Sequence, residues 1–324
     1  MKIFTHFKYL LLFIFSVLPL AGCSDDGVTG VPSDTVTDPL PLALGNRWEY
    51  EMEQSIFVHE DTTKPPIYKS STGRQVLTIN RTETIGGDEA FGVTFYHVMD
   101  FLFAEGADTV LETRYLAPVG NKVLLKATEG VYNPTGGFIP FSNTQGVSRT
   151  GTMIEIGGVK RFVPLERLAH LMLGSESWYQ PSAPAVTGPE LASDGIQNKD
   201  NVYYYTGEYV FVLNELYKGK NWVSSAAQGV GGVGITQKVT NILAELGGYE
   251  GPIAEVEESN TLIEAATSEQ FKIRYYYKSG VGMVQAEISD PEFLIWLQHP
   301  DGSIEVLGVG TWTFIKRLVD YTVN

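Results

Sequence analysis

QVLTINRTETIGGDEAFGVTFYHV, residues 75–98, is the stretch that decides the fold of this chain. Apolar and β-branched residues recur at regular intervals in residues 75–85 and again in residues 91–98, which is typical of strands. Gly86 and Gly87 separate the two runs. The stretch therefore predicts a β-hairpin, and we expect strands and turns to build most of the body.

The same pattern of strand, turn and strand recurs elsewhere in the chain. It is found in residues 235–257 around Gly247-Gly248, in residues 153–163 around Gly157-Gly158, and in residues 293–307 around a turn at 299–302. A last strand is expected at residues 311–315. One helix is expected at residues 164–173, because Pro164 suits a first helical turn and Gly174 suits its end.

These patterns predict a mainly β fold, made of two related antiparallel curved sheets or half-barrels with one or few short helices. The two halves share a series of landmarks, most of them at nearly the same spacing, which indicates an internal duplication. The landmark pairs are Trp48 and Trp222, Gly86-Gly87 and Gly247-Gly248, Arg114-Tyr115 and Arg274-Tyr275, and Gly120 and Gly280. The sequence leaves open whether the halves form separate lobes or one continuous sheet.

The order of these segments predicts five parts in the chain. The small, polar and proline-containing stretches among them cannot bury much apolar surface, so we expect a tether and a linker there. The parts are a signal peptide at residues 1–22, a flexible tether at 23–39, a first β repeat with a connecting hairpin and helix at 40–178, a loop linker at 179–201, and a second β repeat at 202–324.

The N-terminal segment has the layout of an export signal. Lys2 and Lys8 precede an apolar run at residues 9–18, and Leu20-Ala21-Gly22 lead to Cys23. The apolar run is too short for a permanent transmembrane helix, which needs about 20 residues. The Leu-Ala-Gly-Cys run resembles the lipobox of bacterial lipoproteins. That resemblance implies cleavage before Cys23, a diacylglyceryl thioether on its sulfur, an acylated amine with fatty acids such as palmitate, and attachment to a membrane. An ordinary secretory signal is the alternative.

The residues after the cysteine bear on where the protein is held. Ser24-Asp25-Asp26 follow Cys23 and resemble the export signal of surface-exposed lipoproteins of the Bacteroidetes. By resemblance to the usual sorting rule, Ser24 favours the outer membrane over the inner one. We therefore expect a lipid-anchored protein of the outer membrane, with the cell surface as one alternative and the leaflet left open.

Three motifs in the body are similar to those of a family of uncharacterised bacterial lipoproteins. They are the opening PLPLALGNRWEY at residues 39–50, a second Gly-x-x-Trp motif, GKNW, at residues 219–222, and the late aromatic stretch YYYKSGVGMV at residues 275–284. The resemblance extends over most of the chain after the signal. It implies no established activity.

Composition excludes several classes of partner and site. The formal net charge is −15, from 38 acidic and 23 basic residues, which disfavours binding to nucleic acid. Cys23 is the single cysteine. If lipid modifies it, no disulfide can form within the mature chain, and cysteine-based metal sites are excluded as well. Stability must then come from the packed core.

The search for catalytic or metal-binding patterns yields no convincing set. The histidines after the signal, namely His59, His97, His170 and His299, are scattered and show no spacing typical of metal ligands. The other candidates favour structural interpretations. Residues 174–178, with Ser175, resemble a nucleophile elbow, but Trp178 stands where the second glycine is required and the parallel-sheet context is missing. Asp194, Asn198 and Asp200 suit a polar turn, residues 229–234 suit a flexible strand entry, and Glu255, Glu257 and Glu258 suit a solvated face. We expect no metal and no cofactor.

Two tyrosine triplets are the candidates for ligand contact. Residues 203–205 and 275–277 must send rings to both faces of a strand, so Tyr204 and Tyr276 are candidates for stacking on a sugar or contacting a protein. Packing at the edge of the core is the competing explanation.

The sequence thus favours a non-catalytic binding or structural protein of the cell envelope. One alternative is a carrier of an apolar ligand or lipid, in which a curved sheet and the helix at 164–173 enclose a pocket. Surface glycan binding is another. An envelope hydrolase is a third and would need His97 or His170 beside a carboxylate and a nucleophile. The sequence identifies neither a partner nor the oligomeric state.

Overall fold

A computed structural model describes residues 34–59, 65–129, 147–156, 159–166, 168, 202–204, 208–225, 235–260 and 272–324. The predicted signal peptide, the first part of the tether and the predicted linker lie outside these residues. Within them, no helix has the length and apolar character needed to cross a membrane.

The protein is built almost wholly of strands, whose bounds are as follows. They are β1 Val36–Thr37, β2 Arg47–Val58, β3 Ile67–Ile85, β4 Asp88–Asp100, β5 Ala107–Val119, β6 Lys122–Glu129, β7 Arg149–Ile156, β8 Val159–Pro164, β9 Val202–Tyr204, β10 Val210–Leu213, β11 Glu215–Leu216, β12 Asn221–Ser225, β13 Ile235–Leu246, β14 Tyr249–Asn260, β15 Lys272–Lys278, β16 Gly282–Gln298 and β17 Ile304–Thr322. Pro164, which was expected to begin a helix, pairs with Gly151 as the last residue of β8. Leu165, Glu166 and Leu168 are helical, and the other residues of the predicted helix lie outside the described ones.

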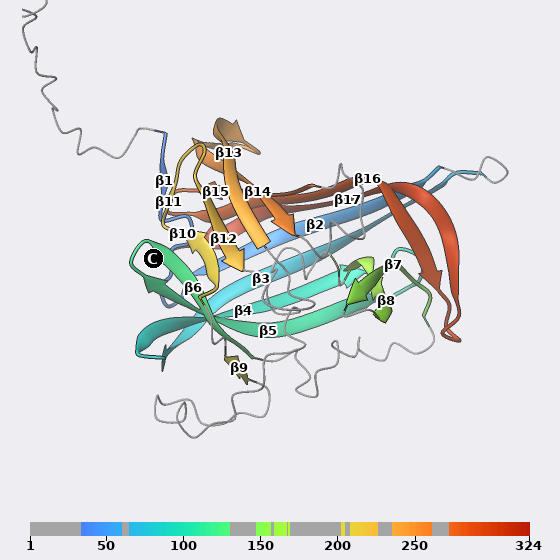
Figure 1. Ribbon diagram of the computed structural model, residues 1–324, viewed down its shortest axis with the longest axis horizontal. Coiled ribbons are helices and arrows are strands. Elements are labelled where there is room, and N and C mark those ends of the chain that lie inside the picture. Colours follow the sequence, from blue (N-terminus) through green and yellow to red (C-terminus); the bar gives the residue numbers. More distant parts are fainter. Residues whose placement is uncertain are drawn as a thin grey trace, which may run out of the picture. The chain divides into compact units, whose positions relative to one another are not determined.

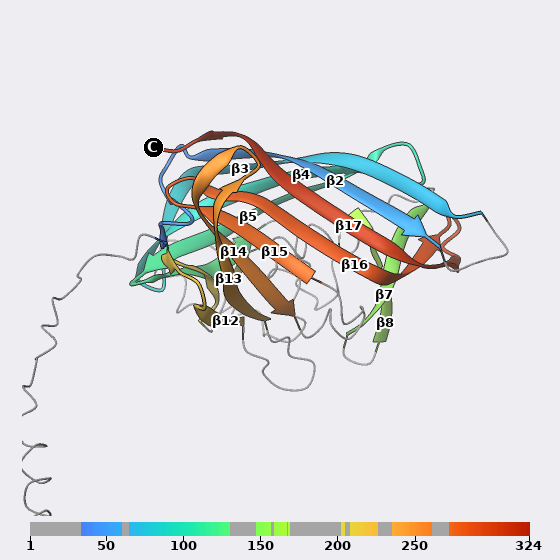
Figure 2. The same ribbon diagram turned by 90° about the horizontal axis from the view of Figure 1, so that it is seen from above.

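The strands form one large antiparallel sheet that nearly closes into a barrel (Figures 1 and 2). Its main path runs β10-β6-β5-β4-β3-β2-β17-β16-β15-β14-β13-β12, and the end strands β10 and β12 lie close to each other. The β7–β8 hairpin pairs with β16, β9 pairs with β6, and β1 and β11 form a separate two-stranded sheet. The predicted mainly β, antiparallel curved fold is confirmed, with both halves fused in a single sheet.

The two halves are meanders of five strands, β2–β6 and β12–β16, which β17 joins by pairing with both β2 and β16. Their landmarks fall at like places. Gly86-Gly87 turn β3 into β4 and Gly247-Gly248 turn β13 into β14, each pair having the two positive φ angles that a tight hairpin turn needs. Gly120 and Gly280 have positive φ after β5 and β15. Duplication as the origin of this likeness stays a prediction.

The hairpins predicted from the sequence are present as β3–β4, β13–β14, β7–β8 and β16–β17. The expected last strand at residues 311–315 is not separate but continues β17. Gly310 allows β17 to pass close to β2, because any other residue would place a Cβ 2.3 Å from the carbonyl oxygen of Phe57 on β2. Side-chain bulk at that position would push the two strands apart.

The folded body begins earlier than the sequence suggested. Val36 and Thr37, placed in the tether at residues 23–39, form β1 and pair with Leu216 and Glu215. Val36 is fully buried and belongs to the core. This part of the tether prediction is wrong because the pairing partner, β11, is remote in the sequence and gives no local signal.

The core fills the concave side of the sheet. Alternate residues of β2 are buried, from Trp48 to Val58, as expected for a strand with one face inside. Trp48 Nε1 donates to the carbonyl oxygen of Val281 at 2.5 Å, and the Tyr50 hydroxyl donates to that of Met283 at 2.9 Å. These two bonds tie the first long strand to the turn before β16 and to the start of β16, in the other half of the chain.

Replacing Trp48 should therefore destabilise the whole sheet. Trp48→Ala leaves a cavity and removes the bond to Val281, so the free energy of unfolding should fall by about 3–5 kcal/mol in urea titrations. Leu111→Ala is the control, because Leu111 is 58% exposed on β5; its loss should be about 0.5 kcal/mol or less. Equal losses in the two variants would contradict this account of the core.

Candidate functional site

A pocket lies inside the curved sheet and collects residues from both halves of the chain. Counted with the open solvent at its mouth, its empty volume is about 610 Å³. Most of the wall is apolar or aromatic, formed by Leu40, Trp48, Tyr50, Leu77, Val93, Phe95, Leu116, Phe211, Tyr275, Tyr277 and Met283. Gln237 and Lys316 are the other lining residues. An apolar wall with few polar groups is typical of a small-molecule site.

Lys316 is the charged member of this wall, and it is 1% exposed. Its ammonium donates to Oε1 of Gln75 and lies over the Tyr50 ring, 4.2 Å from the ring centroid. Among the described residues, no carboxylate forms an ion pair with it. Burial, and then the positive charge of Arg114, lower the pKa of Lys316 to about 7. Near neutral pH the amine is therefore partly uncharged.

Arg114 brings a second buried cation to the interior, but this one is paired. Its Nε donates to Oε1 of Glu112 at 2.6 Å, and both side chains are buried on β5. The guanidinium lies over the Phe95 ring at 4.4 Å from the centroid. Nη1 of Arg114 has no hydrogen-bond partner among the described residues. The opposite charges of Arg114 and Glu112 therefore nearly cancel, and Nη1 of Arg114 donates to no other described residue.

The wall formed by β13, β14 and β15 holds a carboxylate in a polar network. Glu258 accepts hydrogen bonds from the Tyr275 hydroxyl at 3.0 Å and from Nε2 of Gln237 at 2.9 Å. Burial and the nearby Glu258 charge raise the pKa of Tyr275, so its hydroxyl stays protonated and donating. Glu258 was predicted to lie on a solvated face together with Glu255 and Glu257. That is wrong for Glu258, because strand alternation turns it inward.

A further buried ionic cluster lies apart from the pocket wall. Arg149 of β7 contacts Oδ2 of Asp108 at 3.2 Å and Oε1 of Glu166 at 2.8 Å, and stacks over Phe101. Burial raises the pKa of Glu166, with Arg149 opposing the shift. The three groups come from β5, β7 and the helical residues after β8. They secure the β7–β8 hairpin to the body.

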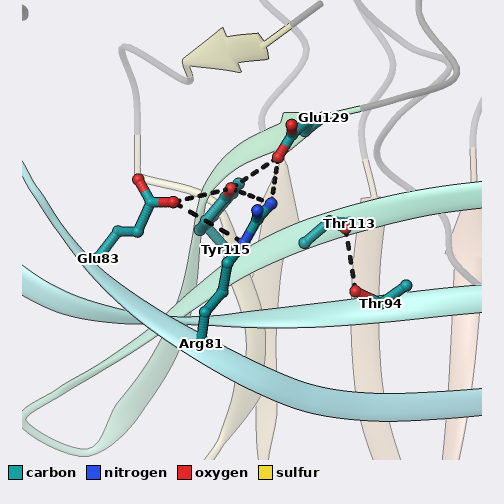
Figure 3. A network of polar contacts seen from close by, with 6 residues as sticks. All are labelled: Arg81, Glu83, Thr94, Thr113, Tyr115 and Glu129. Atoms are coloured by element: carbon teal, nitrogen blue, oxygen red, sulfur yellow. Dashed lines mark hydrogen bonds and ion pairs between the residues drawn. The ribbon is translucent and has the colours of Figure 1, made fainter. Parts of the chain in front are cut away.

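On the outer face, Arg81 and Tyr115 form a cluster with two carboxylates (Figure 3). The Tyr115 hydroxyl lies 2.7 Å from Oε2 of Glu129 and 3.3 Å from Oε1 of Glu83, and Arg81 pairs with Glu129. Tyr204 on β9 is half-buried beside this cluster; burial, followed by the charges of Glu83 and Glu129, raises its pKa to about 12. We interpret these contacts as structural, because they lie where β9 pairs with β6.

Tyr276, the other predicted ligand contact, is buried rather than exposed. Its ring is on the outer face of β15, beside the long side chains of Arg274, Glu255 and Glu287, and its hydroxyl donates to Oε2 of Glu287 at 3.4 Å. The aliphatic parts of such side chains can cover a ring while their charged ends reach water. Burial and the charge of Glu287 raise the pKa of Tyr276 to about 12. The exposure of Tyr276 was misjudged from the sequence. Strand alternation places the ring on the outer face, but it does not show that long neighbouring side chains cover the ring there.

The structure does not bring the described histidines together. His59 follows β2 and is exposed, His97 is buried on β4, and His299 lies 3.5 Å from Glu305 in the β16–β17 turn. No group of three or more potential metal ligands occurs within the described ranges. His170, Ser175, Asp194, Asn198, Asp200 and residues 229–234 lie outside them, as do Cys23 and the lipobox residues Leu20, Ala21 and Gly22.

The sequence search missed Lys316, Arg114 and Gln237. A signal for Lys316 was available: Trp312, Phe314 and Leu318 share its face of β17 by strand alternation, and all three are buried. A lysine in register with three apolar residues is unusual on a core-facing surface.

Comparisons with known proteins give limited guidance. No protein-family model matches the chain, and no curated protein sequence matches it either. A solved structure with some likeness is that of a β-barrel-like protein of a domain of unknown function, DUF1849, from Brucella abortus. The identity is 9% and the TM-score 0.31, over 87% of this chain and 99% of that chain. The function must therefore be argued from the site itself.

The lowered pKa of Lys316 predicts a pH-dependent stability. An unfolded lysine keeps its proton up to its ordinary pKa of 10.5, whereas the folded chain releases it near pH 7. Stability should therefore rise with pH between these values, by at most about 1.4 kcal/mol per unit, because the unfolded state binds more protons there. Below pH 7 both states hold the proton, and the full cost of burying the charge remains.

Comparing Lys316→Met with the wild type isolates this effect. In urea unfolding between pH 6 and pH 10, the variant should be more stable relative to the wild type at pH 6 than at pH 10, with the relative advantage shrinking above pH 7. Other titrating groups are common to both proteins and cancel in the difference. A difference that stays constant over this range would show that Lys316 titrates normally.

Proposed function

We propose that this protein is a non-catalytic binding protein of the cell envelope that carries a small apolar ligand inside its curved sheet. One observation carries the proposal: the pocket inside the sheet has a wall that is mostly apolar and aromatic. Apolar ligands bind such walls because water is released from both surfaces.

The composition of the wall favours a carrier over the other hypotheses. Rings and aliphatic chains come from strands of both meanders, and Phe211 on β10 contributes from the end of the sheet. The nitrogen atoms of the two polar lining residues donate within the wall: Nε2 of Gln237 to Glu258, and the Lys316 ammonium to Gln75. Surface glycan binding through Tyr276 has less support, since that ring is buried.

Native mass spectrometry of residues 24–324, which include every described residue, tests the carrier function. The protein, purified gently from cells, should retain a small molecule at reproducible stoichiometry. Leu116→Trp should lower the occupied fraction at least tenfold, because the larger ring fills the pocket at a lining position. Leu111→Trp is the matched control, since it makes the same change on the exposed face of β5 and should leave occupancy unaltered.

Thermal unfolding of both tryptophan variants checks that they remain folded, because overpacking a core costs about 1–3 kcal/mol. Should the wild type carry no molecule, titration with an apolar fluorescent dye replaces the native ligand as the readout. Dye binding that does not saturate, or that Leu116→Trp leaves unchanged, would overturn the carrier proposal.

Attachment to the envelope is the second part of the proposal and depends on Cys23. Three acyl chains, at about 0.8 kcal/mol per buried methylene, would hold the chain at a membrane almost permanently. The full-length chain should incorporate labelled palmitate and sediment with outer membranes. Cys23→Ala should lose the label. Palmitate labelling that survives this substitution would exclude Cys23 as the lipid-bearing residue.

A further inference from the structure

Lys316 is the feature of the pocket that an apolar ligand alone leaves unexplained. A buried ammonium is costly unless an anion balances it, and here its contacts are the neutral amide of Gln75 and the ring of Tyr50. A methionine would fill the same space without that cost. The lysine is also a lining residue, so its amine is positioned to meet whatever occupies the pocket.

Among the described residues, the charged groups around Lys316 provide no carboxylate that pairs with its ammonium. On β5, Glu112 is already paired with Arg114, whose Nη1 has a spare proton. On β14, Glu258 accepts from Tyr275 and Gln237 and forms no ion pair with Lys316. The other titratable groups that face the interior from neighbouring strands are Tyr50 on β2, His97 on β4, Tyr277 on β15 and Asp290 on β16. The first three supply no negative charge at neutral pH. Asp290 is opposite Trp312, four residues from Lys316 along β17, and accepts a hydrogen bond from the backbone N–H of Glu292.

We infer that the ligand is an amphipathic monocarboxylate, with its apolar body against the aromatic and aliphatic wall and its carboxylate paired with the ammonium of Lys316. This inference rests on the carrier function proposed above and names the ligand class for the same pocket. Arg114 is close enough for its charge to lower the pKa of Lys316, and it is itself paired with Glu112. A carboxylate accepts several hydrogen bonds, so it can accept one from the Lys316 ammonium.

The ion pair links binding to proton uptake. Near pH 8 most of the Lys316 amines are neutral in the free protein, since the pKa lies at about 7. A bound carboxylate favours the charged form, so the amine takes a proton from solvent as the ligand enters. Affinity for a carboxylate should therefore fall as the pH rises from 6 to 9, whereas affinity for a neutral alcohol of equal length should not.

Decanoate and decanol are the probes, measured by displacement of an apolar dye from residues 24–324 at pH 6 and pH 9. In the wild type, decanoate should bind at least tenfold tighter at pH 6 than at pH 9, and decanol equally at both. Lys316→Met should abolish the pH effect on decanoate and keep decanol binding. Arg317→Met removes a charge from the exposed face of the same strand and should behave like the wild type.

Calorimetry on the wild type covers the case in which Lys316→Met does not fold. In two buffers with different heats of ionisation at pH 8, decanoate binding should take up about one proton, and decanol binding none. His97→Gln removes the other nearby titratable side chain, and decanoate binding to this variant should still take up about one proton.

The outcomes divide clearly between the two proposals. Equal pH dependence for decanoate and decanol, or an effect that persists in Lys316→Met and disappears in His97→Gln, would overturn the carboxylate inference while the carrier function stands. Saturable binding of neither probe nor dye would overturn both.

Discussion

The pairing of β17 with β2 is the constraint on which the rest of the structure depends. It joins the last strand of the chain to the first long strand, from Thr322 opposite Arg47 to Gly310 opposite Val58. Two meanders that would otherwise be separate sheets thereby share one concave face. Once that face is fixed, strand alternation decides which side chains lie inside, and Trp48 and Tyr50 bond across it to the backbone at Val281 and Met283.

Closure of the sheet creates an interior that apolar side chains alone do not fill. Ionic groups occupy it in three places: Arg114 with Glu112, Arg149 with Asp108 and Glu166, and Lys316 with the amide of Gln75. Buried ion pairs contribute little to stability, because desolvation offsets most of the attraction. The first two groups are at least compensated within the fold. Lys316 is not compensated in this way, which makes a stability role the poorer explanation and a ligand-binding role the better one.

Sequence reasoning worked where the signal was local. Each predicted hairpin rests on alternation and a local turn signal that act within about 25 residues, and these elements formed as expected. The turn signal is a glycine pair in three hairpins and residues 299–302 in the fourth. It failed where partners are distant in the chain: β1 needs Leu216, Tyr276 is covered by side chains from adjacent strands, and the continuity of β17 needs the backbone of Phe57. The pocket depends on the same distant pairings, so its members could not be grouped from the sequence, although the lysine among Trp312, Phe314 and Leu318 was visible.

The distribution of the pocket residues over the chain connects binding to folding. Leu77, Phe95 and Leu116 belong to the first meander, Tyr275 and Met283 to the second, and Lys316 to the strand that joins them. A ligand that contacts all three would bind the assembled sheet and not its separate halves. By mass action such a ligand stabilises the folded state by an amount that grows with its concentration relative to its dissociation constant. The carboxylate that we propose as the ligand would balance the ammonium of Lys316 and so offset part of the cost of closing the sheet around it.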